Sequence, residues 1–404
     1  MKILLLVSDW KWTGPAEPML VLMAALRRRG HRVELVCPEP PVGAGRSLAG
    51  EARRRGLGPV ATVEAERSAW IPGDAGRARR IARWLASEEI GGPFDLVHCW
   101  HSRDHVLAAR ALGRGVGGRA RSRGARFGSG ETHATRIVRS WSRAETIRAW
   151  PWNRWLFGPA CDGLLCVSPG AASANRAVRP SGLLEGSLGA VDLEALSSAA
   201  AACDARAARR TLGVPEDALL IGVVARMQAH RRFDLLLSAM ARLVVEHPEA
   251  RLVVLGRGTR AEELVARPAR ALGLERHIVL AGYRTDDYAR LLAAMDLFAY
   301  LVPGSDGSCR ALREAAALGL PLVGSRRGAI PEIVVEGETG LLVEEDPKAL
   351  AEAFSLLIRD PVRRRAMGMA AMRDARARFE PDRAAAFVED FYEAALRSAP
   401  ISSR

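Results

Sequence analysis

Short apolar runs alternate with amphipathic stretches along the chain, and this alternation predicts an α/β fold. Residues 2–7 are rich in β-formers, 17–29 repeat apolar positions with a helical period, and 31–37 are apolar again. A strand–helix–strand opening of this kind favours a parallel sheet. A further strand is predicted over 94–100 and a further helix over 105–112.

The second half of the chain repeats the alternation more clearly. Strands are predicted over 218–224, 251–255, 277–281, 297–301 and 321–324, and helices over 233–246, 259–272, 286–295 and 310–318. The pattern indicates a second doubly wound domain, in which a ligand binds beyond the carboxyl ends of the strands. Two or three more helices are predicted over 347–398.

These patterns predict two Rossmann-like domains. We expect an N-terminal domain over 1–190, a linker over 191–215 and a C-terminal domain over 216–375. The remaining residues, 376–404, are predicted to form a helix that packs back toward the N-terminal domain.

Composition is that of a soluble globular protein, with 49% hydrophobic and 26% charged residues among 404. Apolar runs stay below the ~18 residues that a membrane-spanning helix needs, and residues 3–7 are too few for a signal-peptide core. We therefore expect a cytoplasmic protein. The six cysteines form no Cys-x-x-Cys pair, which argues against a disulfide scaffold or a zinc knuckle.

Charge is distributed unevenly between the two halves. Residues 1–190 hold 29 Lys/Arg against 16 Asp/Glu, whereas residues 191–404 hold 30 of each, so the whole net charge of +13 lies in the first half. Such an excess suits nucleic acid, an anionic membrane surface or an acidic acceptor. It is equally compatible with a solvated arginine-rich surface.

The loop before the predicted helix 310–318 is the first feature that suggests binding chemistry. Its residues are Asp306, Gly307, Ser308, Cys309 and Arg310. Backbone N–H groups at a helix start favour phosphate, and Glu314, one turn further on, can accept from a ribose hydroxyl. An ordinary N-cap on a surface helix explains the loop as well.

A second basic loop follows the predicted strand 218–224 and contains Arg226, His230, Arg231 and Arg232. If both loops lie at one edge of the sheet, they supply cations and amides around a diphosphate. The Gly-x-Gly-x-x-Gly motif is absent after residues 2–7, and Gly256-Arg257-Gly258 lacks a third glycine. A nicotinamide enzyme is therefore disfavoured.

The C-terminal half resembles the donor-binding domain of the retaining family 4 glycosyltransferases, which have the two-domain GT-B fold. The resemblance lies in 293–298, 313–323, 329–334 and 337–343, in that order and spacing. In the N-terminal half it is carried by Gly14 and by the segments 29–33 and 94–98.

The resemblance implies a fold of two Rossmann-like domains facing across a cleft. It also implies transfer of a sugar from a nucleotide diphosphate sugar, with no permanently bound cofactor and no protein-bound metal. The acceptor would be a glycan, a lipid-linked molecule or another anionic molecule, as in the synthesis of cell-envelope polysaccharide or lipopolysaccharide. The identity of the acceptor is left open.

The family's site residues fall on particular positions of this chain. Its Glu-x7-Glu pair falls on Asp306 and Glu314, and its diphosphate-binding Arg and Lys fall on Arg226 and Arg231. Arg232 stands where the family has glycine. By the same resemblance the donor is bound by Gly14, Arg226, Arg231, Gly256, Gly307, Ser308, Cys309, Arg310 and Glu314.

Histidines provide the remaining candidates. His133 looks like the family's active-site histidine, which would donate to a sugar hydroxyl, and His101 is a candidate on the acceptor side. His98, His101 and His105 have spacings that a metal could use, but they come from one strand end, so we predict no metal.

Residues 136–157 combine five arginines with four tryptophans. Such a segment suits the surface of an anionic membrane, or else its tryptophans pack onto the sheet while its arginines are solvated. Two rival functions also remain open: a GT-B-fold nucleotide-sugar epimerase, and an arginine-rich nucleic-acid-binding protein. The nucleic-acid binder is disfavoured because no aromatic platform or helix-turn-helix pattern is present.

Overall fold

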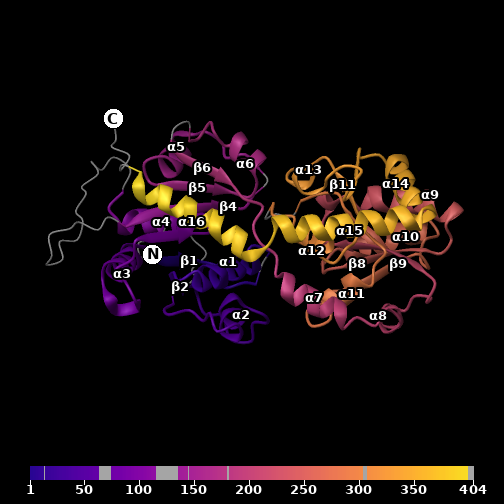
Figure 1. Cartoon of the computed structure of the whole chain (residues 1–404), viewed down its shortest axis with the longest axis horizontal. Coiled ribbons are helices and arrows are strands. Elements are labelled where there is room, and N and C mark those ends of the chain that lie inside the picture. The colour runs from indigo at the N-terminus through magenta and orange to yellow at the C-terminus, as the bar shows by residue number, and fades with distance from the viewer. Residues whose placement is uncertain are drawn as a thin grey trace. The chain divides into compact units, whose positions relative to one another are not determined.

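The computed structural model describes residues 1–12, 14–62, 74–114, 135–143, 145–179, 182–303 and 307–398. The chain divides into two units, of which unit 1 is Met1–Ala190 with Pro381–Arg404 and unit 2 is Val191–Glu380. Each unit contains one six-stranded parallel sheet with helices packed on it (Figure 1). The α/β class expected from the alternating pattern is confirmed.

Unit 1 has the strand order β2-β1-β3-β4-β5-β6. Its strands are β1 (Lys2–Leu6), β2 (Arg32–Val36), β3 (Leu96–Cys99), β4 (Arg136–Trp141), β5 (Gly163–Cys166) and β6 (Leu183–Gly186). Its helices are α1 (Ala16–Arg28), α2 (Leu48–Arg54), α3 (Asp74–Ala86), α4 (Ser102–Ala111), α5 (Pro151–Phe157), α6 (Pro169–Ala174) and α16 (Pro381–Arg397), with the 3-10 turn η1 (Glu88–Ile90).

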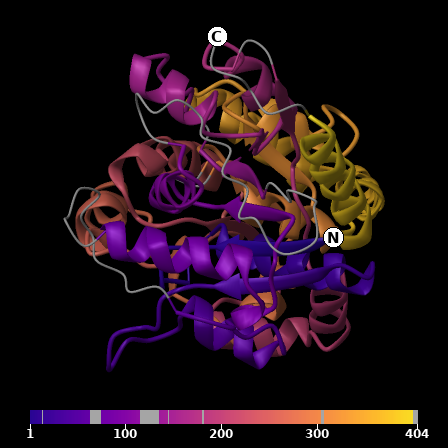
Figure 2. The ribbon, with the colours of Figure 1, turned by 90° about the vertical axis from the view of Figure 1, so that its left-hand side faces the viewer.

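Side chains of unit 1 alternate between two covered faces of its sheet, because successive residues of a strand point to opposite sides. Ile3 and Leu5 pack with α1, α2 and α16, whereas Leu4 and Leu6 pack with α3, α4 and α5. Figure 2, in which unit 1 faces the viewer, shows helices on both sides of the indigo strands. Both faces are buried, which explains the continuous apolar runs in the sequence.

Unit 2 has the strand order β12-β11-β10-β7-β8-β9. Its strands are β7 (Leu219–Val224), β8 (Ala250–Leu255), β9 (Ile278–Gly282), β10 (Leu297–Tyr300), β11 (Leu322–Ser325) and β12 (Gly340–Val343). Its helices are α7 (Leu193–Ala201), α8 (Ala205–Leu212), α9 (Phe233–Glu246), α10 (Arg267–Ala271), α11 (Tyr288–Ala293), α12 (Arg310–Ala317), α13 (Ile330–Ile333), α14 (Pro347–Arg359) and α15 (Pro361–Arg378), with the short turns η2 (Ala229–Arg231) and η3 (Glu262–Ala266).

Two stretches of unit 2 differ from the sequence prediction. The helix predicted over 259–272 runs without a gap over 261–271, but its part η3 is π-helical, and the α-helical α10 follows with Pro268 at its start. Proline has no N–H to donate, so the regular α-helical ladder is interrupted there. Residues 191–215, expected as a linker, hold α7 and α8, whose starts are capped by Asp192 and Asp204.

The strand order reverses once in each sheet. In unit 1 the chain runs outward from β1 to β2 and then returns to β3 beside β1, and in unit 2 it runs from β7 to β9 and returns to β10 beside β7. Loops that leave the two central strands in opposite directions open a crevice at the carboxyl edge, where ligands of such sheets bind. The candidate residues are therefore expected in the loops after β7 and β10, and after β1 and β3.

Candidate active site

The two loops at the reversal point of unit 2 are joined directly. Arg231, in the loop after β7, donates from Nη1 to the carbonyl oxygen of Val302, in the loop after β10, at 2.7 Å. The two basic and small-residue loops noted in the sequence thus lie side by side at one sheet edge. The cations of the first loop therefore lie at the edge of the sheet from which the second loop leads into α12.

The two arginines of the loop after β7 differ in exposure. Arg226 is exposed, whereas Arg231 is half-buried. Its Nε is buried, and the described residues give that nitrogen no hydrogen-bond partner. A guanidinium held on one side by a carbonyl and unsatisfied at Nε suits a bound anion, because guanidinium groups bind phosphate oxygens through several N–H groups at once.

Arg232 has a backbone conformation that glycine adopts more easily than other residues. Its φ is 57°, in the left-handed region that costs a side-chain-bearing residue strain. The side chain is held by ion pairs to Asp234, at 3.2 Å, and to Glu345. These contacts anchor the end of the loop just before α9.

Gly256 ends β8 next to the same loop, with φ 157°. A Cβ at this position would overlap the carbonyl oxygen of Ala225. Only glycine lets the loop after β7 approach the end of β8 this closely. Gly256 therefore permits the close approach of Ala225, the residue before Arg226.

The start of α12 is built on two left-handed residues, Gly307 with φ 58° and Cys309 with φ 48°. Cys309 is completely buried, so its thiol packs and does not face solvent. Arg313 is also completely buried, and its Nε donates to the Ser308 carbonyl at 3.1 Å. The loop that enters α12 is therefore held from within unit 2.

Glu314 is nearly buried, and both of its carboxylate oxygens accept hydrogen bonds. Tyr288 donates from its hydroxyl to Oε2, and Arg310 donates from Nε to Oε1, each at 2.6 Å. Arg310, which the sequence suggests as a phosphate ligand, holds this carboxylate through its Nε. A ribose hydroxyl at Glu314 would share these oxygens with Tyr288 and Arg310.

Tyr288 and Arg313 were not predicted from the sequence. Tyr288 lies 26 residues before its partner Glu314 and begins a different helix, so no spacing rule connects them. Arg313 follows the loop directly, but an arginine beside a basic site gives no sign that it is buried.

Two candidate residues of unit 1 lie in the loops at the reversal point of its own sheet. Gly14 lies in the loop after β1, and His101 precedes α4 after β3. His101 is half-buried and donates from its backbone N–H to Oδ2 of Asp104 at 2.7 Å. Burial of Asp104 opposes its ionisation, yet hydrogen bonds from the side chains of His101 and Ser8 keep the pKa of Asp104 below its ordinary value. Two further candidates, His133 and Asp306, lie outside the described residues.

His98 and His105 point into the core. His98 lies between the Tyr392 hydroxyl, 2.6 Å from Nδ1, and the Ser140 hydroxyl, 2.7 Å from Nε2. His105 lies 3.1 Å from the Ala160 carbonyl oxygen through Nε2. Burial, reinforced by the nearby Arg139 charge, lowers the pKa of each to about 3. In the part of the chain that the structure describes, no group of three or more His, Cys, Asp or Glu could hold a metal ion.

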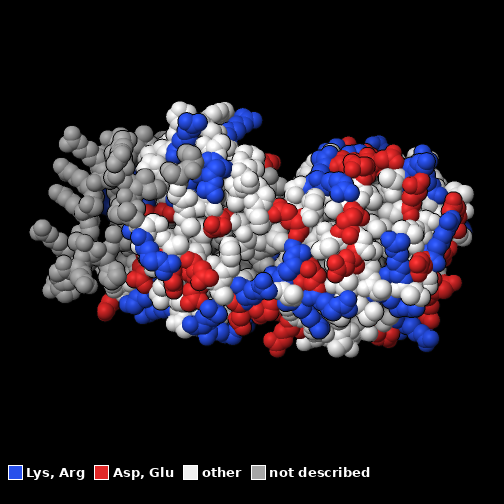
Figure 3. Space-filling model, turned by 45° about the horizontal axis from the view of Figure 1, so that its top comes forward, with Lys and Arg blue, Asp and Glu red and all other residues white. Residues whose placement is uncertain are grey.

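Surface charge is mixed in both units. Figure 3 shows basic and acidic side chains interspersed over the face in view. Many arginines of unit 1 form ion pairs, as Arg28 does with Asp382 at 2.9 Å and Arg55 with Glu17 at 2.8 Å. Within the described ranges, the helices lack the combination of length and hydropathy that crossing a bilayer requires.

Family comparisons agree with this architecture of two doubly wound units. Residues 18–180 match the family described as Glycosyltransferase Family 4, and residues 218–360 match the family described as Glycosyl transferases group 1. Together the two matches take up most of the chain. The chain belongs to the GT-B glycosyltransferases with a Family 4 N-terminal domain.

A D-inositol 3-phosphate glycosyltransferase of Corynebacterium kroppenstedtii is 36% identical to this chain over 201 residues. The match covers 48% of the chain and 44% of that relative, so the similarity spans less than half of the curated protein. Similar enzymes of other Corynebacterium species match at 32–35% identity.

Solved structures resemble the chain over nearly its whole length at low identity, which establishes the fold. HepE of Anabaena, crystallised with UDP and glucose, has a TM-score of 0.73 at 18% identity and covers 98% of this chain and 100% of its own. A glycosyltransferase of Rickettsia africae has a TM-score of 0.77 at 15% identity over 98% of this chain and 99% of its own. A putative UDP-N-acetylglucosamine 2-epimerase of Listeria monocytogenes, at 14% identity, has a TM-score of 0.63 and is covered completely, as is this chain.

Proposed function

We propose that the chain is a retaining glycosyltransferase that moves a hexose-type sugar from a nucleotide diphosphate sugar to an anionic acceptor. The observation that carries the proposal is the contact between Arg231 and Val302, which joins the loop of Arg226 to the loop after β10, the loop that leads into α12. This arrangement suits the diphosphate of a donor. The names of the relatives and the UDP bound by HepE support the same donor class.

In this proposal the charge that develops on the departing diphosphate is stabilised by Arg226, Arg231 and the amides at the start of α12. Such preorganised donors act strongly because they need no reorganisation as the charge develops. Glu314 binds the ribose, and Gly14 leaves room for the donor phosphate. Asp306 and His133 would contact the transferred sugar. Retention by a front-face route follows from the resemblance to family 4.

The acceptor is proposed to bind unit 1 near His101. The relatives are named for a phosphorylated inositol, which supports an acceptor that carries a phosphate. A glycan or lipid-linked acceptor of cell-envelope synthesis fits the same basic unit. For a lipid-linked acceptor, we propose a cytoplasmic enzyme that contacts the inner face of the membrane through the exposed Trp150 and Trp152.

A GT-B-fold epimerase is the second candidate, because the Listeria protein named as an epimerase shares the fold. An epimerase would consume the same donor without any acceptor. A nucleic-acid binder is disfavoured, since its basic surface would not carry so many arginines already paired with carboxylates.

A thermal-shift screen of nucleotide sugars tests the donor, because a ligand raises the melting temperature by mass action. Turnover of the best donor is then measured with and without inositol phosphate. Release of nucleoside diphosphate that depends on the acceptor supports transfer, and the anomeric configuration of the product tests retention. Conversion of the donor without acceptor would favour the epimerase. A chain that binds no nucleotide sugar would refute both.

A further inference from the structure

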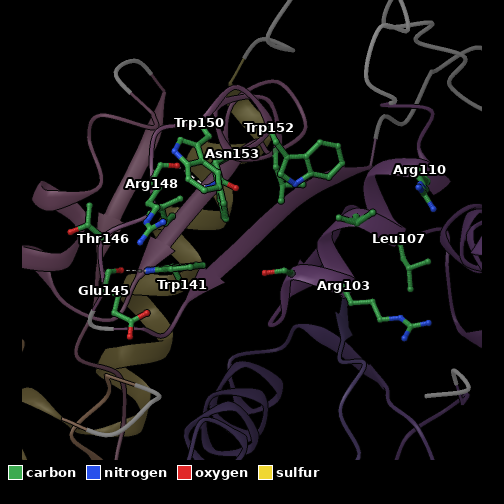
Figure 4. A pocket seen from close by; sticks show the side chains of 15 residues that line it. Arg103, Leu107, Arg110, Trp141, Glu145, Thr146, Arg148, Trp150, Trp152 and Asn153 are labelled. Carbon is green, nitrogen blue, oxygen red and sulfur yellow. Dashed lines mark hydrogen bonds between the residues drawn. The ribbon is translucent and has the colours of Figure 1, made fainter. Parts of the chain in front are cut away.

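Unit 1 contains a pocket whose lining includes the exposed Trp150 and Trp152. Its volume is about 490 Å³, and it lies between α4 and the segment that joins β4 to α5. Figure 4 shows Arg103, Leu107 and Arg110 of α4 on one side and Trp141, Arg148 and Trp150 on the other. A pocket of 300–1,000 Å³ is the usual size for a small-molecule ligand.

The interior of the pocket is mostly apolar. Leu107, Ile147, Leu156 and Phe157 are buried beneath it, and Trp141 lies half-buried in its wall. Trp150 and Trp152 are respectively 61% and 37% exposed, although large aromatic side chains are usually covered. Indole rings that stay exposed around an apolar hollow offer a contact area for a ligand at little cost in side-chain entropy.

The wall that carries these tryptophans is held in place by hydrogen bonds. The indole N–H of Trp141 donates to the Glu145 carbonyl at 2.9 Å, and the Ile147 N–H donates to the Asn175 side chain at 2.7 Å. Asn153 donates from its side chain to the Arg148 carbonyl at 2.8 Å. The pocket therefore exists before any ligand enters, which lowers the entropic cost of binding.

Charge at the pocket favours an anion. Arg103, Arg110 and Arg148 line it, against the single carboxylate of Glu145. The guanidinium carbon of Arg148 lies 5.4 Å from the ring centroid of Trp150, a cation–π contact that holds the cation at the pocket wall. By contrast, Arg136 and Arg139 of the same Arg/Trp segment are buried within β4 and cannot serve a ligand here.

We propose that this pocket binds a small amphiphilic anion, in which an apolar chain or ring system carries one phosphate or carboxylate. The apolar body lies between Leu107 and the tryptophans, and the anionic group meets Arg148 at the rim. All lining residues belong to unit 1, and the proposal does not rest on glycosyl transfer. The same chemistry could come from a free metabolite or from a lipid phosphate within a membrane.

Decyl phosphate, below its micelle concentration, is a direct probe. Titration calorimetry on the full chain, without nucleotide sugar, is expected to give one saturable site. Inorganic phosphate, which has no apolar body, should bind at least about tenfold more weakly, because burial of the chain contributes much of the affinity. Decyltrimethylammonium, which reverses the charge, should bind at least about tenfold more weakly as well.

Two variants locate the site, and a third provides the control. Arg148→Gln and Trp150→Ala are each expected to weaken decyl phosphate binding about tenfold, since each removes one half of the recognition. Both residues are exposed, so neither change should alter thermal unfolding. Arg154→Gln is the matched control, because Arg154 is an exposed arginine of α5 outside the pocket lining.

Three results would overturn the proposal. The chain could fail to bind decyl phosphate, or the two variants could bind it as tightly as the wild type does. The wild-type chain could also bind decyltrimethylammonium as tightly as decyl phosphate. The chain could instead bind vesicles of anionic phospholipid and not monomeric decyl phosphate. That result would indicate that residues 136–157 contact a membrane surface, and it would contradict a ligand in the pocket.

Discussion

Arg231 and Val302 share a hydrogen bond of 2.7 Å between the guanidinium and the backbone carbonyl. One side chain therefore fixes the distance between the loops after β7 and β10 and also presents its remaining N–H groups at the reversal point of the sheet. In this position a lysine would supply charge, but its single ammonium could not as readily span a carbonyl and a phosphate. An arginine at position 231 therefore suits both contacts.

Arg231→Ala is expected to lower sugar transfer roughly 10²–10³-fold, the effect of removing one preorganised donor to a developing charge. Arg231→Lys should recover part of this loss, because the charge returns without the forked geometry. Steady-state release of nucleoside diphosphate measures both. Arg270→Ala, in which an exposed arginine of the same unit is removed, should leave the rate unchanged. A folded Arg231→Ala protein with the wild-type rate would exclude the residue from the mechanism.

Glu314→Gln is expected to weaken nucleotide binding without unfolding the chain, because an amide accepts more weakly from ribose hydroxyls than a carboxylate does. Tyr288→Phe, which removes the hydroxyl 2.6 Å from Oε2, should weaken binding less, since Arg310 still orients the carboxylate. Titration calorimetry with UDP compares the variants. If Asp306→Asn loses binding while Glu314→Gln keeps it, the roles proposed for the two carboxylates are reversed.

Gly256→Ala is expected to destabilise unit 2 by about 2–4 kcal/mol, because the added Cβ overlaps the Ala225 carbonyl and the backbone is in a glycine-only region. Gly273→Ala is the matched control. Gly273 also has a positive φ, 67°, but a Cβ there would meet nothing within 4 Å, so only backbone strain of about 1 kcal/mol is expected. Urea unfolding compares the two variants, and equal losses would contradict the steric argument.

Stability is expected to fall as the pH decreases below about 6.5. The native chain keeps His98 and His105 neutral, with pKa values lowered to about 3 by burial and by the Arg139 charge. The unfolded chain protonates them near their ordinary pKa of ~6.5, so each costs about 1.4 kcal/mol per pH unit between these values.

Urea midpoints between pH 7 and pH 5 measure this dependence, since most carboxylates stay ionised in that window. His98→Gln lowers the free energy of unfolding at pH 7. Because one titrating group is lost, the slope of that free energy against pH should also decrease by about 1.4 kcal/mol per pH unit. The explanation fails if the slope is the same in the variant and in the wild type.

Much of the fold could be predicted because both sheets are covered on both faces. Continuous apolar runs such as 2–7 and 218–224 are typical of buried parallel strands, and the helices between them have clear periods. Because the ends of these strands could be predicted, the loops that follow 218–224 and 297–301 could be predicted as well. The helical period of 259–272 predicts the helix there, but it does not reveal the π-helical part η3 that precedes Pro268.

Contacts between distant segments could not be predicted in the same way. The pairing of Tyr288 with Glu314 depends on how α11 and α12 meet, and the burial of Arg313 depends on Phe379, whose ring centroid lies 5.7 Å from the guanidinium carbon. Both sequence interpretations of residues 136–157 place the arginines at a surface, either against a membrane or in solvent. Two of these arginines are instead buried in β4, a difference that composition alone does not reveal.

Helix α16 bears on how the chain acquires its structure during synthesis. Val388, Phe391 and Tyr392 complete the core of unit 1, yet every residue of unit 2 precedes them in the chain. While unit 2 is translated on the ribosome, the first 190 residues therefore lack α16 and expose the part of their core that this helix covers, although α1 and α2 already pack on the same face. Once α16 has left the ribosome, it can pack on unit 1 and complete its core. Nascent chains stopped before Pro381 should consequently bind chaperones that recognise exposed apolar surface, whereas full-length chains should not.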